Sequence, residues 1–147
     1  MNRLDASVVA VNCEASLALV EVELDNGTRL TAMMAGGAGA FVPGARVTAG
    51  FKSAEVSLAK GALGRISLRN RLVATIDSLD LGRLMARVTL DCDGHKIVSL
   101  ITARAASDLE LAPGDAVTAL IKANELSLWI EAGDGPCCAR STGVRCF

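Results

Sequence analysis

The sequence has few of the residues that carry enzyme chemistry: 147 residues include one histidine and no tyrosine. That histidine, His95, follows a predicted turn, and no Ser-His-Asp set or Cys-His pair can be assembled around it. The carboxylates are scattered over turns and strand edges, and no phosphate-binding loop or dinucleotide fingerprint occurs. We therefore expect a protein that is not an enzyme.

Aromatic residues and excess positive charge are also scarce. The chain has one tryptophan and three phenylalanines, its formal net charge is -1 and its pI is about 5.8. Proteins that bind single-stranded nucleic acid use stacking rings along a basic groove, and anionic membranes also attract basic surfaces. The composition therefore argues against nucleic acid and membrane lipid as partners.

No apolar run is long enough to cross a bilayer, because every stretch without charged residues is shorter than the span that a bilayer needs. The segment 6–11 after Arg3 is apolar, but Asp5, Asn12 and Glu14 bound it too closely for a secretion leader. Because the segment belongs to an internal repeat, we interpret it as a strand. The expected compartment is the cytoplasm.

The five cysteines are an odd number, which is poor evidence for a disulfide framework. Cys13 and Cys92 lie within strand patterns, so both are predicted to be buried thiols. Cys137, Cys138 and Cys146 lie in a Gly/Pro/Arg-containing tail, where a thiolate metal site is conceivable but reactive thiols are the commoner outcome. No metal ion bound directly by protein side chains is predicted.

What the chain does have is an internal repeat. Asn2-Arg3-Leu4 returns as Asn70-Arg71-Leu72, and the segment 43–58 returns, with similar spacing, as 113–128. We predict a first module over 1–60, a linker over 61–66, a second module over 67–131 and a flexible tail over 132–147. Each module is small, and the chain is 51% hydrophobic, so surplus apolar surface is expected to be buried in an oligomer.

Each module has the pattern of five short strands. Alternation predicts Leu72, Ala74 and Ile76 on one buried face, and Asn-Gly and Asp-Gly pairs mark hairpin turns. The predicted strands are 5–11, 16–24, 28–34, 45–52 and 55–60, then 71–77, 84–90, 95–101, 116–122 and 125–130. A short helix over 102–109 is predicted in the second module only, because glycine-rich 35–40 replaces it in the first. The predicted fold class is all-β, with two tandem five-stranded OB-like barrels.

Hydroxyl, guanidinium, amide and ammonium groups gather at the entry of the second module and near its penultimate turn. They belong to Ser67, Arg69, Asn70, Lys122 and Asn124, with Ala123 as a small residue that leaves backbone N–H groups open, and the first module echoes them with Asn2, Lys52 and Ser53. Such donors suit a small oxyanion, which accepts hydrogen bonds and donates none. Arg69 and Lys122 as ordinary solvated residues flanking strands are the alternative interpretation, and both stay open at this point.

The motifs Ser67-x-Arg69-Asn70, Ile101-Thr102, 111–114 and Ile121-Lys122-Ala123 resemble the molybdate-binding modules called Mop or TOBE domains. The resemblance covers nearly all of 67–130 and, more weakly, 2–60, as in tandem-module molbindins. It implies OB-type barrels, a homotrimer, and molybdate or tungstate bound between modules for storage, buffering or sensing.

Carried over by residue, the resemblance implies that Ser67, Arg69, Asn70, Thr102, Lys122, Ala123 and the backbone near Asn124 line the oxyanion site. The first module departs from the pattern, because it begins at Met1-Asn2 without the serine and arginine of the entry motif. We therefore expect its own sites to be weakened or lost. The alternative function is a regulatory or assembly module that mainly contacts proteins and whose anion site has decayed.

Overall fold

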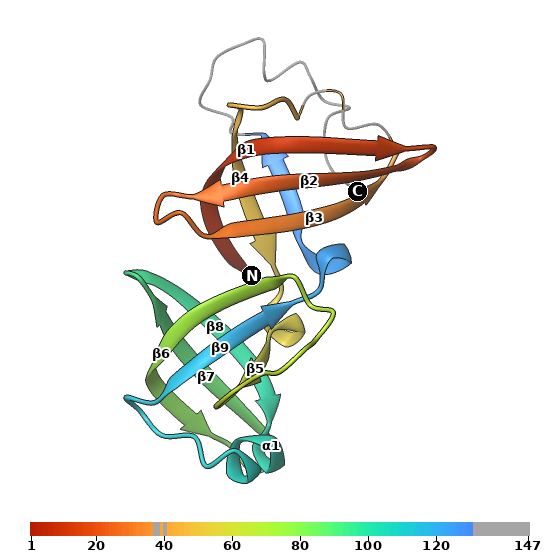
Figure 1. Cartoon of the computed structure of the whole chain (residues 1–147). Coiled ribbons are helices and arrows are strands. Elements are labelled where there is room, and N and C mark those ends of the chain that lie inside the picture. The colour runs from red at the N-terminus through yellow and green to blue at the C-terminus, as the bar shows by residue number, and fades with distance from the viewer. Residues whose placement is uncertain (37–38, 40, 131–147) are drawn as a thin grey trace. The chain divides into compact units, whose positions relative to one another are not determined.

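The computed structural model describes residues 1–36, 39 and 41–130, which form two five-stranded antiparallel sheets and one short α-helix (Figure 1). The predicted all-β class and the helix in the second repeat are confirmed. The predicted tail lies outside the described residues. The strands are β1 (Asn2–Glu14), β2 (Leu17–Leu24), β3 (Arg29–Ala35), β4 (Arg46–Phe51), β5 (Ser57–Ala59), β6 (Asn70–Leu81), β7 (Met85–Cys92), β8 (His95–Thr102), β9 (Ala116–Ile121) and β10 (Ser127–Ile130), with helix α1 (Ala103–Asp108) and 3-10 turns η1 (Ser53–Glu55) and η2 (Ala123–Glu125).

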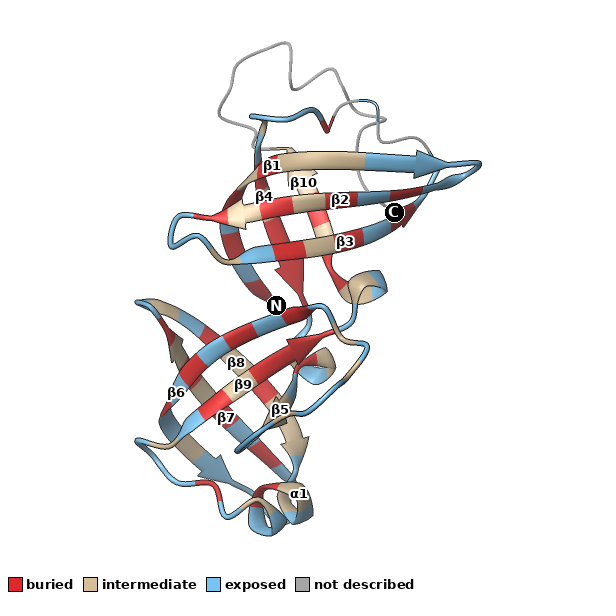
Figure 2. Cartoon of the chain, viewed as in Figure 1, coloured by how far each residue is buried: buried red, intermediate tan, exposed pale blue. Residues whose placement is uncertain are grey.

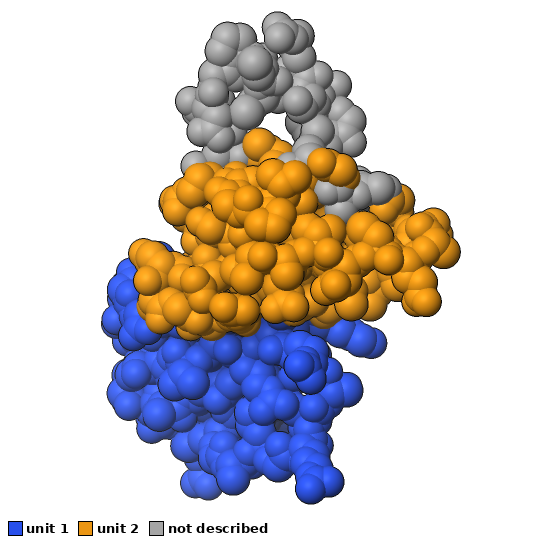
Figure 3. Space-filling view, turned by 45° about the horizontal axis from the view of Figure 1, so that its top comes forward, with its two compact units in different colours: residues 1–2, 51–122 blue, residues 3–50, 123–147 orange. Residues whose placement is uncertain are grey.

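The two compact units do not follow the two sequence repeats. Unit 1 consists of residues 1–2 and 51–122, and unit 2 of residues 3–50 and the chain from 123 on (Figure 3). The sheet of unit 1 has the order β5-β9-β6-β7-β8, and the sheet of unit 2 has the order β10-β4-β1-β2-β3. Each sheet therefore takes four strands from one repeat and its edge strand, β5 or β10, from the other.

The core of unit 1 lies under the inner face of its sheet (Figure 2). Leu72, Ala74 and Ile76 on β6 are all less than 5% exposed, as the alternation predicts. The β6–β7 register shifts between Ile76 and Ser78, which is a β-bulge. The bulge bends a strand that is twelve residues long, so that one strand serves both halves of a curled sheet.

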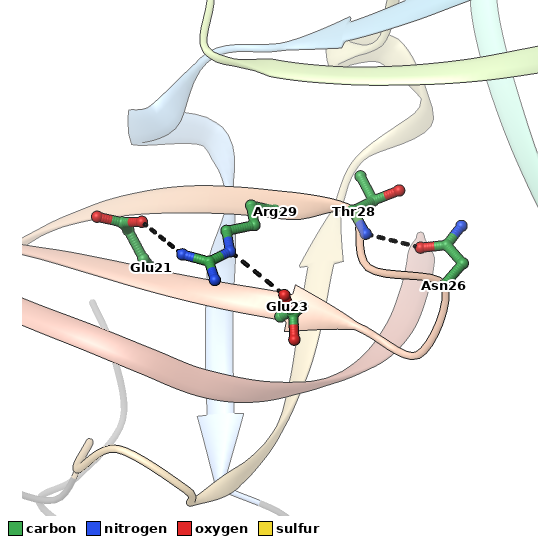
Figure 4. Close-up of polar contacts among 5 residues, drawn as sticks. All are labelled: Glu21, Glu23, Asn26, Thr28 and Arg29. Atoms are coloured by element: carbon green, nitrogen blue, oxygen red, sulfur yellow. Dashed lines mark hydrogen bonds and ion pairs between the residues drawn. The ribbon is translucent and has the colours of Figure 1, made fainter.

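In unit 2, polar contacts support the predicted hairpin between β2 and β3 (Figure 4). The backbone N–H of Thr28 donates to Asn26 Oδ1 at 2.9 Å, which closes the turn. Across the strands, Arg29 lies 3.3 Å from a carboxylate oxygen of Glu23 and 3.9 Å from one of Glu21. These are exposed pairs, so they select the register more than they stabilise the unit.

The two 3-10 turns shorten the predicted strands. The prediction for 55–60 becomes a strand only over Ser57–Ala59, because Ser53–Glu55 forms η1. The strand predicted over 125–130 likewise covers only Ser127–Ile130, because η2 extends to Glu125. Helix α1 agrees with its prediction, and its N-cap is Thr102, whose Oγ1 accepts from the N–H of Ala105 at 3.1 Å.

The prediction that both Cys13 and Cys92 are buried is wrong for Cys13. Cys92 on β7 is buried, and burial raises the pKa of its thiol, but Cys13 is exposed. Cys13 lies one residue before the end of β1, where the β1–β2 hairpin runs past the packed part of the sheet. Residues 12–17 are all exposed there, so an apolar-looking position in a strand pattern faces solvent.

Candidate functional site

The residues that sequence analysis selected for oxyanion binding are divided unequally between the units. Unit 1 contains Asn2, Lys52, Ser53, Ser67, Arg69, Asn70, Thr102 and Lys122, whereas Ala123 and Asn124 belong to unit 2. Within unit 1 these residues occupy three separate places: the joint end of β6 and β9, the middle of β8, and the far end of β8 beside α1.

The first place brings Arg69 and Lys122 together. Asn70 pairs with Ile121 at the last position of the β6–β9 ladder, so the next residue on each side is Arg69 or Lys122. Both side chains are exposed, and neither forms a hydrogen bond or ion pair with another residue among 1–36, 39 and 41–130. Like charges at opposite positions repel each other, so this end of the sheet favours a bound anion.

The segment before β6 is shaped by a residue that sequence analysis did not select. Arg71 Nε donates to the carbonyl oxygen of Leu68 at 3.0 Å, and Arg71 Nη2 donates to that of Ile66 at 3.4 Å. Leu68, Arg69 and Arg71 line an open hollow of about 300 Å³. Arg71 therefore holds the segment that carries Ser67 and Arg69, and the repeated Asn-Arg-Leu triplet was the available signal for it.

The two asparagines of that repeated triplet are buried, Asn70 fully and Asn2 at 6% exposure. The structure engages the Asn2 amide on both sides. Asn2 Nδ2 donates to the carbonyl oxygen of Val98 at 2.9 Å, and the N–H of Val98 donates to Asn2 Oδ1 at 2.8 Å. Asn2 therefore holds the N-terminus against β8. This strand is the edge of the unit 1 sheet, so its outer backbone groups pair with no other strand of that sheet.

Lys52 and Ser53 lie near the same stretch of β8. Turn η1 packs against β8, and the buried Ser99 hydroxyl donates to the carbonyl oxygen of Val56 at 2.7 Å. Lys52 is exposed, and its side chain also makes no hydrogen bond or ion pair with another described residue. This second place offers one ammonium group and one hydroxyl, without the guanidinium present at the end of β6.

Thr102 lies at the opposite end of unit 1 from Arg69. It pairs with Met85 at the end of the β7–β8 ladder, beyond the pair of Ala86 and Ile101, whereas Asn70 begins β6. Asn70 and Leu81 are the first and last residues of the twelve-residue strand β6, and Leu81 lies at the same end of the sheet as Thr102. Within a single chain, Thr102 therefore does not lie beside Arg69 and Lys122.

Ala123 and Asn124 begin turn η2 in unit 2, where η2 packs beside β3. Asn124 is exposed and Ala123 is half-buried. They follow Lys122 directly, so the family-like Lys-Ala stretch runs across the boundary between the units.

The pKa shifts of two charged residues in unit 1 come from ion pairs. A hydrogen bond from Lys60 lowers the pKa of Asp115, and a hydrogen bond to Asp77 raises the pKa of Lys96, as in ordinary ion pairs. Among the described residues, no group of three or more His, Cys, Asp or Glu side chains could hold a metal ion.

In the same described part of the chain, no helix has the length and apolar character needed to span a membrane.

A comparison of the sequence with models of protein families identifies the family of this chain. The model of the TOBE domain matches residues 1–58 and again 66–128. The chain belongs to the TOBE-domain family. The two matches coincide with the two sequence repeats, so this is a tandem TOBE chain whose compact units exchange their edge strands.

Three relatives of the tandem TOBE chain are informative. The molybdenum-pterin-binding proteins MopA and MopB of Rhodobacter capsulatus are 42% and 36% identical, over 54% and 86% of this chain. The chain spans 31% and 49% of their lengths, about half or less. The crystal structure of the cytoplasmic molybdate-binding protein ModG, with molybdate bound, matches with a TM-score of 0.84 and 31% identity, covering 88% of this chain and 96% of that one.

Proposed function

We propose that this tandem TOBE chain binds molybdate, with Arg69 and Lys122 as the principal cationic ligands. The observation that carries the proposal is the placement of these two like charges at the joint end of β6 and β9, without a partner among the described residues. A tetrahedral dianion between them would replace repulsion with charge-assisted hydrogen bonds. The ligand bound by ModG and the names of MopA and MopB support the choice of molybdate.

The hydroxyl of Ser67 and the polar groups that follow Lys122 are proposed to complete the donor set. Ser67 is exposed on the segment that Arg71 holds by its two carbonyl contacts. Ala123 and Asn124 offer backbone N–H groups, and Asn124 adds a side-chain amide that can donate. Asn70 is fully buried, so its proposed role is to fix the start of β6.

We propose that Thr102 serves such a site from a different copy of the chain, because Thr102 and Arg69 lie at opposite ends of the sheet of unit 1. This supports a homo-oligomer, and we propose a homotrimer with oxyanion sites between modules. Exposed Leu81, Leu84 and Met85 near Thr102, which are 60%, 71% and 49% exposed, supply apolar surface that such an assembly would cover.

The sites that involve the first repeat are proposed to be weaker than those of the second. Met1 precedes Asn2 where Arg69 precedes Asn70, so the guanidinium is missing. The Asn2 amide is also committed to the backbone of Val98. Lys52 and Ser53 remain as donors. We expect fewer bound anions per trimer than the number of equivalent module interfaces would allow.

The proposed biological role is storage, buffering or sensing of molybdate in the cytoplasm, without catalysis. Tungstate, which has nearly the same size and charge, is expected to bind the same site. Sulfate is smaller, so rejection of sulfate would depend on the dimensions of the completed site.

Isothermal titration of the purified full chain with molybdate tests the proposal, with sulfate as the control anion and the oligomer mass measured in parallel. Arg69→Ala and Lys122→Met should each weaken molybdate binding about 10- to 100-fold, since each removes a charge-assisted hydrogen bond. Arg87→Gln is the matched control, because Arg87 is an exposed arginine on β7 away from the joint end of β6 and β9.

The oligomer should keep its mass in both site variants, because an exposed charge does not hold subunits together. Dissociation of the Arg69→Ala protein would show that Arg69 is structural. Absence of molybdate binding by a well-folded wild-type oligomer would overturn the proposal. In that case the exposed apolar hairpin of Leu81, Leu84 and Met85 favours the second function, a module that mainly contacts proteins.

A further inference from the structure

Unit 2 has a hollow that the molybdate proposal does not use. Arg3, Thr48 and Trp129 line it, and its volume is about 220 Å³. The three residues lie on β1, β4 and β10, which are neighbours in the sheet (Figure 2). Thr48 and Trp129 are directly opposite across the β4–β10 ladder, so their side chains share one face. The adjacent Val47 and Ala49 are fully buried, which makes the hollow part of the outer face.

The guanidinium of Arg3 is available in this hollow. Arg3 is exposed and makes no hydrogen bond or ion pair with any other residue that the structure describes. Its counterpart in the second repeat, Arg71, is committed to the carbonyl oxygens of Leu68 and Ile66. The same sequence triplet therefore gives a structural arginine in unit 1 and an uncommitted one in unit 2.

The aromatic ring is also particular to this unit. Leu128-Trp129 corresponds to Leu58-Ala59 in the repeat, so unit 1 has a methyl group where unit 2 has an indole. Trp129 is half-buried on the edge strand of its sheet, and it is the one tryptophan of the chain. A large aromatic side chain at a half-exposed edge position, beside an uncommitted arginine, is an arrangement suited to binding a flat, charged ligand.

From these observations we propose that the hollow of Arg3, Thr48 and Trp129 binds a small planar aromatic compound with one carboxylate group. The ring of the ligand stacks on the indole, Arg3 binds the carboxylate, and the Thr48 hydroxyl donates to or accepts from a polar ring substituent. A hollow of about 220 Å³ is smaller than the sites of drug-sized ligands, so it suits one or two fused rings.

Asp5 limits the charge of the ligand. It is exposed two residues after Arg3 on β1, and therefore on the same face of the strand, about 7 Å along it. A dianion would meet repulsion from this carboxylate, whereas a monoanion held at Arg3 is attracted more strongly than it is repelled. Removing the charge by Asp5→Asn should therefore strengthen binding of an aromatic monocarboxylate.

The single tryptophan provides a direct test by NMR on the full-length protein. Its indole N–H gives one cross-peak, which is followed during titration with 2-naphthoate and, as the uncharged control, 2-naphthamide. We expect a saturable shift with 2-naphthoate and binding of 2-naphthamide about tenfold weaker, because only the carboxylate pairs with Arg3. Molybdate should leave the indole cross-peak in place.

Variants separate the roles of the residues. Arg3→Gln should weaken 2-naphthoate binding about tenfold, while Arg87→Gln on β7 of unit 1 should leave it unchanged. Preserved backbone amide dispersion shows that each variant is folded. An indole cross-peak that does not move with 2-naphthoate, equal affinity for the acid and the amide, or an unaffected Arg3→Gln protein would each overturn the proposal.

Discussion

Replacing Asn2 with alanine should destabilise the protein in the absence of any anion. Asn2 is 6% exposed, and its amide forms two hydrogen bonds of 2.8 and 2.9 Å with the backbone of Val98 on edge strand β8. Asn2→Ala removes both partners and leaves the N–H and carbonyl of Val98 without protein partners. We expect a loss of about 2–3 kcal/mol, from roughly 1 kcal/mol for each bond and a smaller penalty for groups that water reaches only in part.

Urea unfolding followed by far-UV circular dichroism measures this loss, and the m-value should be unchanged. The matched control is Asn12→Ala, since Asn12 is exposed on the same strand and should change the free energy of unfolding by less than about 0.5 kcal/mol. Asn2→Asp keeps an acceptor but places a carboxylate against the Val98 carbonyl, so at neutral pH it should destabilise at least as much as alanine.

A result in which Asn2→Ala and Asn12→Ala have the same small effect would refute this reasoning. The clamp would then contribute nothing to unit 1, and the two short hydrogen bonds would only replace equivalent bonds to water. Asn2 would in that case be available for the ligand role that the sequence motif suggested.

Three further predictions concern unit 1 and its edge strand. Ser99→Ala should cost about 1–3 kcal/mol in urea unfolding, because the buried carbonyl of Val56 loses its donor. Lys60 lowers the pKa of Asp115, so this pair stabilises the fold above the ordinary carboxyl pKa and the stabilisation disappears as the pH falls through the lowered value. Asp115→Asn should therefore flatten the acid limb of the stability profile, and an unchanged limb would contradict it. A fragment of residues 61–131 lacks β5 and the partner of β10, so gel filtration and circular dichroism should show an unfolded or associated species; a monomer that unfolds cooperatively would contradict the strand exchange.

Local patterns in the sequence predicted most of the fold correctly. Alternation placed Leu72, Ala74 and Ile76 in the core because side chains on a strand point to opposite faces in turn. The helix after Thr102 followed from a capping hydroxyl and nearby alanines. The prediction that Cys13 is buried was wrong, because alternation shows which face of a strand a residue lies on but not where the packed part of the sheet ends.

For the candidate site, the sequence motif predicted the residue types, and the structure decided which of them meet. Arg69 and Lys122 are more than fifty residues apart, and only the β6–β9 register makes them neighbours. Thr102 carries the same family signal yet lies at the other end of the sheet. Arg3 and Arg71 show most directly that a sequence motif does not determine a side chain's contacts. They occupy the same place in the repeated triplet, yet Arg71 donates to a backbone carbonyl and Arg3 has no partner among the described residues.

By itself, the sequence determined the repeat, the strands and their turns, the short helix and the chemical character of the candidate ligands, because these depend on neighbours along the chain. Only the tertiary structure decided that β5 and β10 complete the sheet of the other repeat, that Asn2 closes against Val98 and that Trp129 lies beside Arg3. Both edge strands begin with Ser-Leu, so the local sequence does not show which of the two strands completes a given sheet. Which one does so is determined by the path of the connecting chain and by long-range packing.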